Sequence, residues 1–477
     1  MERKNAWEKY PEGSAKYKKL MNFAEQYRLF LSEHKTEREC AEFFAKESGF
    51  EDLDEIIRKG RKLKAGDRVY RSNRGKGLAM FVIGSEPLEK GMNILGAHID
   101  SPRMDLKQNP MYEDTDMVLL DTHYYGGIKK YQWVTIPLAM HGVIVRSDGS
   151  EVQVCIGEDP SDPVFGVSDL LIHLAGDQMD KKGSKVIEGE DLNVLVGSEP
   201  LSDSLLEEYA SDAGLSSDEK KALKKERVKA GILSILKKKY NVSEEDFLSA
   251  EIEVVPAGAA RDYGFDRSMI MGYGHDDRVC AYPSWAAICD LKKTQKTAVC
   301  LLVDKEEIGS VGATGMQSRF FENTVAEVLE AQGKYSELSV RRALANSKAL
   351  SSDVSAAFDP NYPSVMDKKN AAYFGRGMVI NKYTGARGKS GSNDASAEYM
   401  GQLRGIFDSE KVSFQTAELG KVDQGGGGTI AYILGNYAMN VIDSGVAVLN
   451  MHAPWEIISK ADLYEAYLAY KAFLKKA

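Results

Sequence analysis

The chain has 477 residues, and its 62 lysines and arginines stand against 71 acidic residues, which gives a net charge of -9. This length predicts two or three domains with ample buried volume. No stripe of basic residues concentrates the positive charge, which argues against nucleic acid as a partner. Positions 1–30 lack the apolar core of a signal peptide, and no window of about 18 apolar residues predicts a membrane span. We therefore expect a cytoplasmic protein with neither a nucleic acid nor a membrane as a partner.

The chain begins with a helical segment and then changes its hydrophobic period. Apolar residues recur at helical spacing over positions 17–50, which predicts two amphipathic helices. Short apolar stretches between glycines and charged turns follow over positions 68–102, and they predict strands of an α/β core. We expect the first part of this core to end near Lys107.

The middle of the chain has a different character. Strand-like stretches over positions 132–157 give way to a charged, helix-forming run over positions 216–240. Strand and helix alternation then resumes and continues to a predicted C-terminal helix. We therefore predict an α/β fold with a discontinuous catalytic domain, residues 1–107 and 255–477, and an inserted β-rich domain over residues 108–254.

Polar residues of the types that bind metals or catalyse reactions stand at the edges of two predicted elements. His98 closes an apolar strand, and Asp100 lies two residues further on. Because strand side chains alternate with a period of two, both point to the same face. Asp276 and Asp277 stand at the predicted start of a helix, after a glycine loop. A role as N-cap explains one of these two acids but not both.

Further acids and a second histidine follow other apolar strands. Glu306 and Glu307 come shortly after the apolar run 297–303. Neighbouring strand side chains point to opposite sides, so both glutamates face one site only if the strand has dissolved into a loop. Asp353 is expected inside a strand of small residues, and His452 between a strand and the C-terminal helix.

These positions together predict a metal site. Open α/β sheets form their ligand sites at the carboxyl ends of the strands. A buried, unpaired carboxylate is costly, so converging acids require cations, and these motifs contain few basic residues. Imidazoles and carboxylates suit divalent transition metals, and a shared aspartate can bridge two ions roughly 3.5–4 Å apart.

The motifs resemble those of the M18 metalloaminopeptidases, the aspartyl aminopeptidase family. The chain resembles a bacterial-type member of this family. The matching stretches are AHIDSPRMDLK, YYGGIKKYQW, DLLIHLAGDQ, VDKEEIGSVGATG, SSDVSAAFDPNYP and NMHAPWEIISKADLYEAY, and the likeness runs from about Phe23 to the C-terminus. The resemblance implies a zinc-exopeptidase fold, a mixed sheet of the phosphorylase/hydrolase-like type flanked by helices, with an inserted domain that mediates dimerisation. It further implies self-association of dimers into a tetrahedral dodecamer, and two zinc ions per subunit, with cobalt or manganese as alternatives.

The resemblance also implies a ligand role for five residues. His98 and Asp353 belong with one zinc ion in the family pattern. Glu307 and His452 belong with the other ion. Asp276 bridges the two, since the bridging aspartate of the family is followed by a second Asp or Asn.

Two catalytic positions and one residue from a neighbouring subunit follow from the same resemblance. Glu306 corresponds to the general base that takes a proton from the water between the metal ions. Asp100 corresponds to the acid that orients His98 or its zinc ion. His173 matches a histidine that family members bring into the active site from a neighbouring subunit.

The expected substrate pocket departs from the aspartyl-specific pattern. Asn381 stands where those members carry a lysine, and Ala356 and Gly388 stand where they carry a histidine and a tyrosine. Gly425 and Gly426 lie in a glycine-rich stretch where the family lines its pocket, and such a backbone can approach a peptide closely. A preference for acidic N-terminal residues therefore stays open.

The leading hypothesis is a metalloaminopeptidase that hydrolyses the N-terminal peptide bond of peptides through a water activated by two metal ions. The alternatives are a co-catalytic di-zinc aminopeptidase for neutral residues, a related deacylase, and a non-catalytic, metal-stabilised oligomeric shell. The presence of both Glu306 and Asp276 argues against the last of these.

Overall fold

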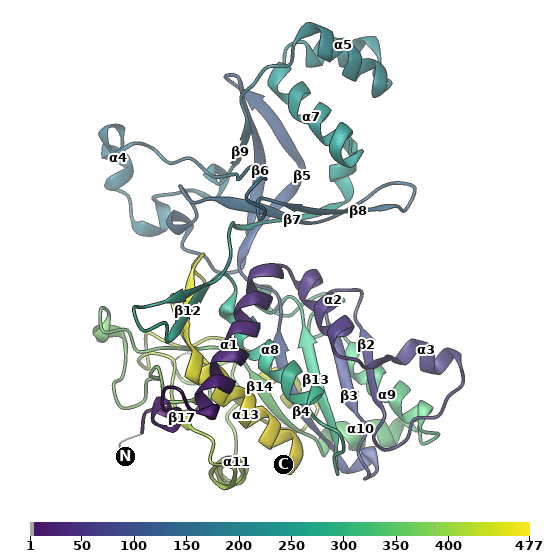
Figure 1. Cartoon of the computed structure of the whole chain (residues 1–477), viewed down its shortest axis with the longest axis vertical. Coiled ribbons are helices and arrows are strands. Elements are labelled where there is room, and N and C mark those ends of the chain that lie inside the picture. Colours follow the sequence, from purple (N-terminus) through teal and green to yellow (C-terminus); the bar gives the residue numbers. More distant parts are fainter. Residues whose placement is uncertain (1–3, 386) are drawn as a thin grey trace. The chain divides into compact units, whose positions relative to one another are not determined.

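The computed structural model describes residues 4–385 and 387–477, and the chain divides into two compact units (Figure 1). Unit 1 is formed by the chain up to Ser101 and from Ala259 onward, and unit 2 is formed by Pro102–Gly258. The insertion predicted from the sequence, 108–254, falls inside unit 2. Unit 2 is longer because the strands at its two ends belong wholly to its own sheet.

Unit 1 is built around a nine-stranded mixed sheet. Its central strands β13 and β4 run parallel, whereas β13 and β3 run antiparallel. In spatial order the strands are β1 (Glu51–Asp52), β2 (Arg68–Ser72), β3 (Leu78–Val82), β13 (Thr297–Val303), β4 (Met92–His98), β14 (Lys348–Ser352), β18 (Asn440–Gly445), β16 (Met378–Asn381) and β17 (Phe414–Thr416).

Helices cover both faces of this sheet and give it two hydrophobic cores. One core is shared with α1 (Ala15–Glu33), α2 (Glu37–Glu47), α8 (His275–Cys289), α11 (Ala397–Glu410) and α13 (Lys460–Lys476). The other is shared with α3 (Leu53–Arg58), α9 (Phe320–Ala331), α10 (Glu337–Ala345) and α12 (Ala431–Gly435). The predicted α/β class, a mixed sheet flanked by helices, is confirmed.

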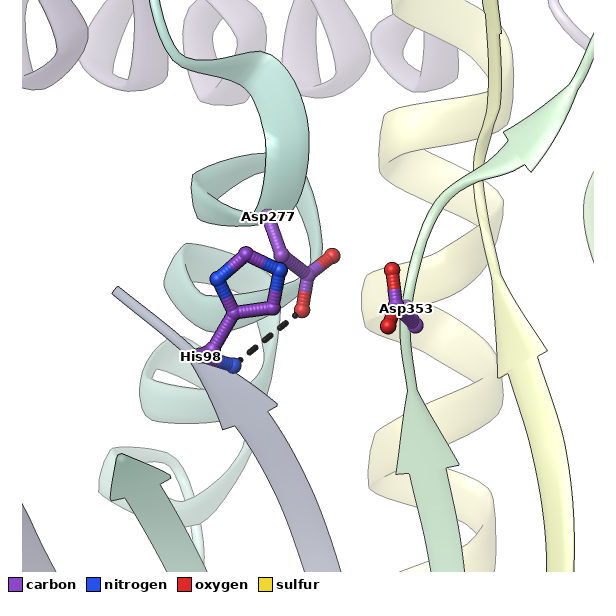
Figure 2. Close-up of side chains that lie close together, drawn as sticks. All are labelled: His98, Asp277 and Asp353. Carbon is purple, nitrogen blue, oxygen red and sulfur yellow. Dashed lines mark hydrogen bonds between the residues drawn. The ribbon is translucent and has the colours of Figure 1, made fainter. Parts of the chain in front are cut away.

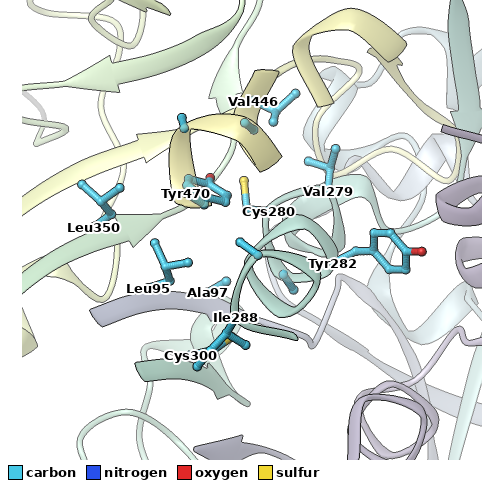
Figure 3. Close-up of a cluster of buried hydrophobic side chains, with 14 of the residues drawn as sticks. Leu95, Ala97, Val279, Cys280, Tyr282, Ile288, Cys300, Leu350, Val446 and Tyr470 are labelled. Carbon is cyan, nitrogen blue, oxygen red and sulfur yellow. The ribbon is translucent and has the colours of Figure 1, made fainter. Parts of the chain in front are cut away.

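Strand β13 shows how a run without polar residues becomes a central strand. Cys300 and Leu302 pack into the core beneath α8 and α13, whereas Val299 and Leu301 pack into the opposite core. Side chains of a strand alternate between faces, so a strand covered on both sides must be apolar throughout. Figure 3 shows the first of these cores, where side chains of β4 and β13 meet those of α8.

A five-stranded sheet completes unit 1. In spatial order its strands are β11 (Arg261–Tyr263), β12 (Met269–Gly272), β20 (Glu456–Ser459), β19 (Ala447–Leu449) and β15 (Ser355–Ala356). His452 lies between a strand, β19, and the C-terminal helix α13, as expected, but the short strand β20 that precedes this helix was not predicted. Four residues carry too little alternation to be separated by pattern from the helix that follows.

Unit 2 contains a six-stranded antiparallel sheet and short helices. Its strands are, in spatial order, β8 (Glu151–Ile156), β7 (Leu138–Val145), β10 (Ala250–Pro256), β5 (Arg103–Asp114), β6 (Met117–Tyr125) and β9 (Val194–Gly197). Its helices are α4 (Gly176–Met179), α5 (Asp203–Asp212), α6 (Ser217–Leu223) and α7 (Arg227–Tyr240). Within the described residues, no helix of either unit combines the length and apolar character that crossing a membrane requires.

Asp443 in β18 is a buried carboxylate with an incomplete set of partners. Its Oδ1 accepts a hydrogen bond of 2.6 Å from the Thr429 hydroxyl, while its Oδ2 has no hydrogen-bond partner among the residues that the structure describes. Burial raises the pKa of Asp443 to about 7. An aspartate in an unfolded chain titrates at about 3.9, so the folded state holds this proton more tightly. The stability contributed by the protonated group is therefore lost as the pH rises through the folded pKa.

Replacing Asp443 with a residue that cannot ionise should remove this pH dependence. Asp443→Asn keeps the shape of the side chain and an acceptor for Thr429. We expect its free energy of unfolding, relative to the wild type, to increase by about 2–3 kcal/mol between pH 5 and pH 8, measured by urea denaturation. The exposed carboxylate of Asp367 provides the matched control, Asp367→Asn. An equal increase in the control, or none in Asp443→Asn, would contradict the prediction.

Candidate metal centre

The parallel register of β4 and β13 brings His98 next to the segment that carries Glu306 and Glu307. His98 ends β4 and pairs with Val303, the last residue of β13. His98 is 2% exposed, and its Nδ1 lies 2.9 Å from the backbone oxygen of Asp100. This contact directs the other ring nitrogen, Nε2, toward the remaining acids.

Asp276 lies between the two histidines. Its Oδ1 is 3.1 Å from Nε2 of His98, and its Oδ2 is 3.3 Å from Nε2 of His452. Burial raises the pKa of Asp276, but hydrogen bonds and attraction from His452 and His98 outweigh burial, and the net pKa is lowered. One ionised carboxylate therefore presents one oxygen to each imidazole.

An irregular backbone at the start of α8 places Asp276 in this position. Asp276 and Asp277 are not helical, and the preceding Gly274 has a φ of +77°. A Cβ at Gly274 would lie 2.0 Å from a guanidinium nitrogen of the buried Arg278. Only glycine suits both the left-handed backbone and the close approach.

Asp100 holds the turn that follows β13. Its Oδ1 accepts from the backbone N–H of Glu306 and its Oδ2 from that of Glu307, both at 3.2 Å. The turn begins at Lys305, which has a φ of +67°, and continues as a 3-10 turn over Glu306–Ile308. The strand thus ends before the glutamates, which confirms the loop that was needed for both to face one site.

The two glutamates approach different histidines. Glu306 Oε2 lies 3.9 Å from His98 Nε2, and Glu307 Oε2 lies 3.7 Å from His452 Nε2. Burial raises the pKa of Glu306 to about 7, and nearby Asp276 adds to the increase. Burial and Asp276 also raise the pKa of Glu307 well above its usual range. Each glutamate is therefore costly to ionise unless a cation is near.

Asp353 forms a group with His98 and Asp277, in which the potential ligand atoms lie within 4.8 Å of one another (Figure 2). Asp353 follows β14, which ends at Ser352, so the prediction that it lies inside the strand was wrong. Asp277 Oδ2 accepts from the backbone N–H of His98 at 3.4 Å. The second acid of the Asp276-Asp277 pair, which the sequence left unassigned, thus lies on the Asp353 side of the centre.

Glu456 is a member of the centre that the sequence did not predict. It is 1% exposed, and it accepts from the backbone N–H of Asp276 at 3.0 Å and from that of His452 at 2.7 Å. Burial raises the pKa of Glu456 to about 8. A single glutamate at the start of a short strand carries no pattern that marks it as functional.

The donors fit a metal centre. Two further groups of potential ligands lie within the same distance limit, namely His98 with Glu306 and Glu307, and Asp276 with Glu307 and His452. Within the part of the chain that the structure describes, Oε1 of Glu307 and Oδ1 of Asp277 are buried without a hydrogen-bond partner. Such oxygens are unfavourable unless a cation or a proton satisfies them. Imidazole nitrogens and carboxylate oxygens are ordinary zinc ligands.

The predicted substrate residues lie outside these groups. Asn381 is buried at the end of β16, and its amide donates to the backbone oxygen of Ala417 at 3.0 Å. A Cβ at Gly425 would lie 1.7 Å from the Leu419 oxygen, and Gly426 has a φ of +113°. The backbone itself therefore requires glycine at both positions.

His173 belongs to unit 2. It lies on a short 3-10 turn, Ile172–Leu174, and is exposed. None of the ligand groups found among the described residues includes His173.

The fold and the donors together define a protein of the metal-dependent hydrolase type, and comparison with known proteins gives its family. The family model described as aminopeptidase I zinc metalloprotease (M18) matches residues 30–474. The chain belongs to the M18 family of zinc metalloaminopeptidases.

Relatives match the chain over almost its full length. It is 62% identical to the probable M18 family aminopeptidase 1 of Clostridium acetobutylicum, covering 99% of this chain and 98% of that protein. The crystal structure of aminopeptidase I from the same organism has a TM-score of 0.89 at 60% identity, covering 100% of this chain and 99% of that chain. The M18 aminopeptidase structure from Thermotoga maritima has a TM-score of 0.90 at 43% identity, covering 100% of both chains.

A more distant likeness concerns the fold alone. The S. cerevisiae mApe1 dodecamer has a TM-score of 0.72 at 19% identity, covering 94% of this chain and 95% of that chain.

Proposed function

We propose that the chain is an aminopeptidase with two metal ions, and that Asp276 is the ligand they share. The position of Asp276, with one carboxylate oxygen toward each histidine, carries this proposal. His98 and Asp353 would complete the coordination of one ion. Glu307 and His452 would complete that of the other. Zinc supplies Lewis-acid chemistry, because it acidifies water and polarises a carbonyl group.

Glu306 is the general base in this proposal. Its Oε2 takes a proton from the attacking water and returns it to the leaving amine. Its side chain is 16% exposed, whereas that of Glu307 is 4% exposed, so Glu306 has the better access to water. Asp100 contributes by holding the backbone of both glutamates and the ring of His98. The two neighbouring glutamates thus divide binding and proton transfer between them.

Glutamine at the two positions should separate these roles. We expect Glu306→Gln to retain the bound zinc while kcat falls by about 10²–10⁴-fold, because general acid–base catalysis contributes that much. Glu307→Gln should lose both activity and metal, since it removes a ligand. Metal content by atomic emission and hydrolysis of Leu p-nitroanilide measure the two effects. Full activity in Glu306→Gln, or loss of metal from both variants alike, would refute the division.

For specificity we propose a neutral N-terminal residue. Asn381 occupies the position of the lysine that pairs with acidic substrates, and its amide is already bonded to Ala417. The nearby Lys382 and Lys389 both pair with Asp394, the latter at 3.0 Å. A substrate carboxylate would therefore lose its hydration without gaining a cation from Lys382 or Lys389, which Asp394 already holds.

A panel of aminoacyl substrates tests this specificity. We expect kcat/KM for Leu and Met substrates to exceed that for Asp and Glu substrates by at least roughly tenfold, because burying an unpaired carboxylate is unfavourable. The control Lys382→Gln should leave the ratio unchanged, since that lysine is bound to Asp394. Preferred cleavage of Asp substrates that disappears in Lys382→Gln would assign acidic specificity to Lys382 instead.

We further propose self-association through unit 2, with dimers that assemble into a tetrahedral dodecamer and His173 reaching the centre of a neighbouring subunit. The segment around His173 exposes large apolar side chains, namely Leu170, Leu171, Ile172 and Leu174, at 46%, 54%, 69% and 68%. Contiguous exposed apolar residues mark interaction surfaces. The dodecameric relative with the same fold supports an assembly of this kind.

Co-expression of two inactive variants tests the role of His173. Each of His173→Ala and Glu306→Gln alone should form full-size assemblies with little activity. A mixed assembly of equal amounts should regain up to about a quarter of the wild-type activity, because about half of its subunits have intact Glu306 and about half of those receive His173 from a neighbour. Mass photometry gives the size and a peptidase assay gives the activity. Monomers of full activity, or mixtures no better than either variant, would reject the arrangement.

A further inference from the structure

Glu456 connects two parts of the centre that are far apart in the sequence. It is the first residue of β20 and pairs with Gly272 of β12. Each of its side-chain oxygens accepts one backbone N–H, Oε2 from Asp276 and Oε1 from His452. Since both oxygens are engaged with backbone groups, the side chain acts on the two residues rather than on the substrate.

Both backbone segments that Glu456 binds are irregular. Asp276 has a φ of -79° and a ψ of 108°, which are non-helical values within the first turn of α8. His452 has a φ of +66°, in the left-handed region that non-glycine residues rarely adopt. Neither N–H can be satisfied by a regular helix or strand at these positions, so an acceptor from elsewhere is required.

The contacts of Glu456 close a ring of interactions. Its carboxylate holds the backbone of Asp276 and that of His452, and the side chains of those two residues meet at 3.3 Å. The relative position of the two side chains is therefore determined largely by one buried acid.

Asp100 has the same arrangement on the other side of the centre. It accepts from the backbone N–H of Glu306 and from that of Glu307, as Glu456 does from those of Asp276 and His452. Two buried carboxylates thus hold the backbone of four residues of the centre, Asp276, Glu306, Glu307 and His452.

We propose that Glu456 is a positioning residue that fixes Asp276 and His452 in the geometry of the shared metal position. The inference rests on the proposed metal centre. Residues that orient metal ligands commonly change metal affinity by about 10–100-fold when they are replaced. Glu456 would therefore influence metal affinity and geometry without being a ligand.

The decisive variant is Glu456→Gln, which keeps the size of the side chain but turns one acceptor oxygen into an N–H donor. The purified full-length protein is stripped of metal and titrated with Co²⁺, whose visible absorption reports coordination geometry. We expect Co²⁺ affinity about 10–100-fold weaker than in the wild type, with a changed absorption spectrum. Glu456→Asp keeps the carboxyl group and should recover part of the affinity.

The matched control is Asp462→Asn in α13. Asp462 is also buried and also accepts from two backbone N–H groups, those of Gly375 at 2.8 Å and Gly377 at 2.7 Å. This control should lower the Tm of the metal-free protein while leaving the Co²⁺ spectrum unchanged and the affinity within about twofold, because the hydrogen bonds of Asp462 within the described residues go to Gly375 and Gly377 and to none of the proposed ligands.

The outcomes separate the inference from the proposed function. If the wild type binds no Co²⁺, the metal centre itself is wrong. If the wild type binds Co²⁺ and Glu456→Gln binds it with the same affinity and spectrum, Glu456 has no positioning role. Should Glu456→Gln fail to fold, Glu456→Asp decides the question, and wild-type affinity and spectrum in that variant overturn the inference.

Discussion

Strands β4 and β13 pair in parallel register from Met92 opposite Thr297 to His98 opposite Val303. Because the side chains of a strand alternate with a period of two, a slip of one residue would exchange the residues of the two cores and turn His98 away from the centre. In the observed register β13 packs against an apolar core on each of its faces. The turn that carries the glutamates therefore begins beside His98, at the ends of the two strands. The hydrogen bonds of Asp100 hold it in this position.

The electrostatics of the centre depend on this convergence. Acids from five separate segments meet around two histidines, and burial raises the pKa of Asp277, Glu306, Glu307, Asp353 and Glu456. Asp276 is the exception, because both imidazoles favour its ionised form. Two acids, Asp100 and Glu456, accept backbone N–H groups, and this is a different use of a buried carboxylate from binding a cation. The centre thus combines acids that organise the chain with acids whose oxygens stay available for metal.

The sequence predicted the residues that chemistry marks directly. An apolar run interrupted by two glutamates, or a histidine followed by an aspartate at a strand end, is visible because it contradicts the expected distribution of charge. The mixed α/β fold was also predicted, because buried strands and amphipathic helices have different hydrophobic periods. The sequence did not predict β20, which is too short to show a period, or Glu456, whose partners are backbone groups. Almost any residue type can donate a backbone N–H, so the sequence does not reveal hydrogen bonds of this kind.

The order of strands in the nine-stranded sheet also bears on how the chain folds. β3 and β4 follow each other in the sequence, yet β13 lies between them, and β13 comes from beyond unit 2. During synthesis the edges of β3 and β4 that pair with β13 remain unpaired until all of unit 2 and α8 have been made. Non-local pairing of this kind slows folding and leaves unpaired edges exposed to other chains. Nascent or truncated chains that end before Thr297 should therefore aggregate, however stable the finished sheet is.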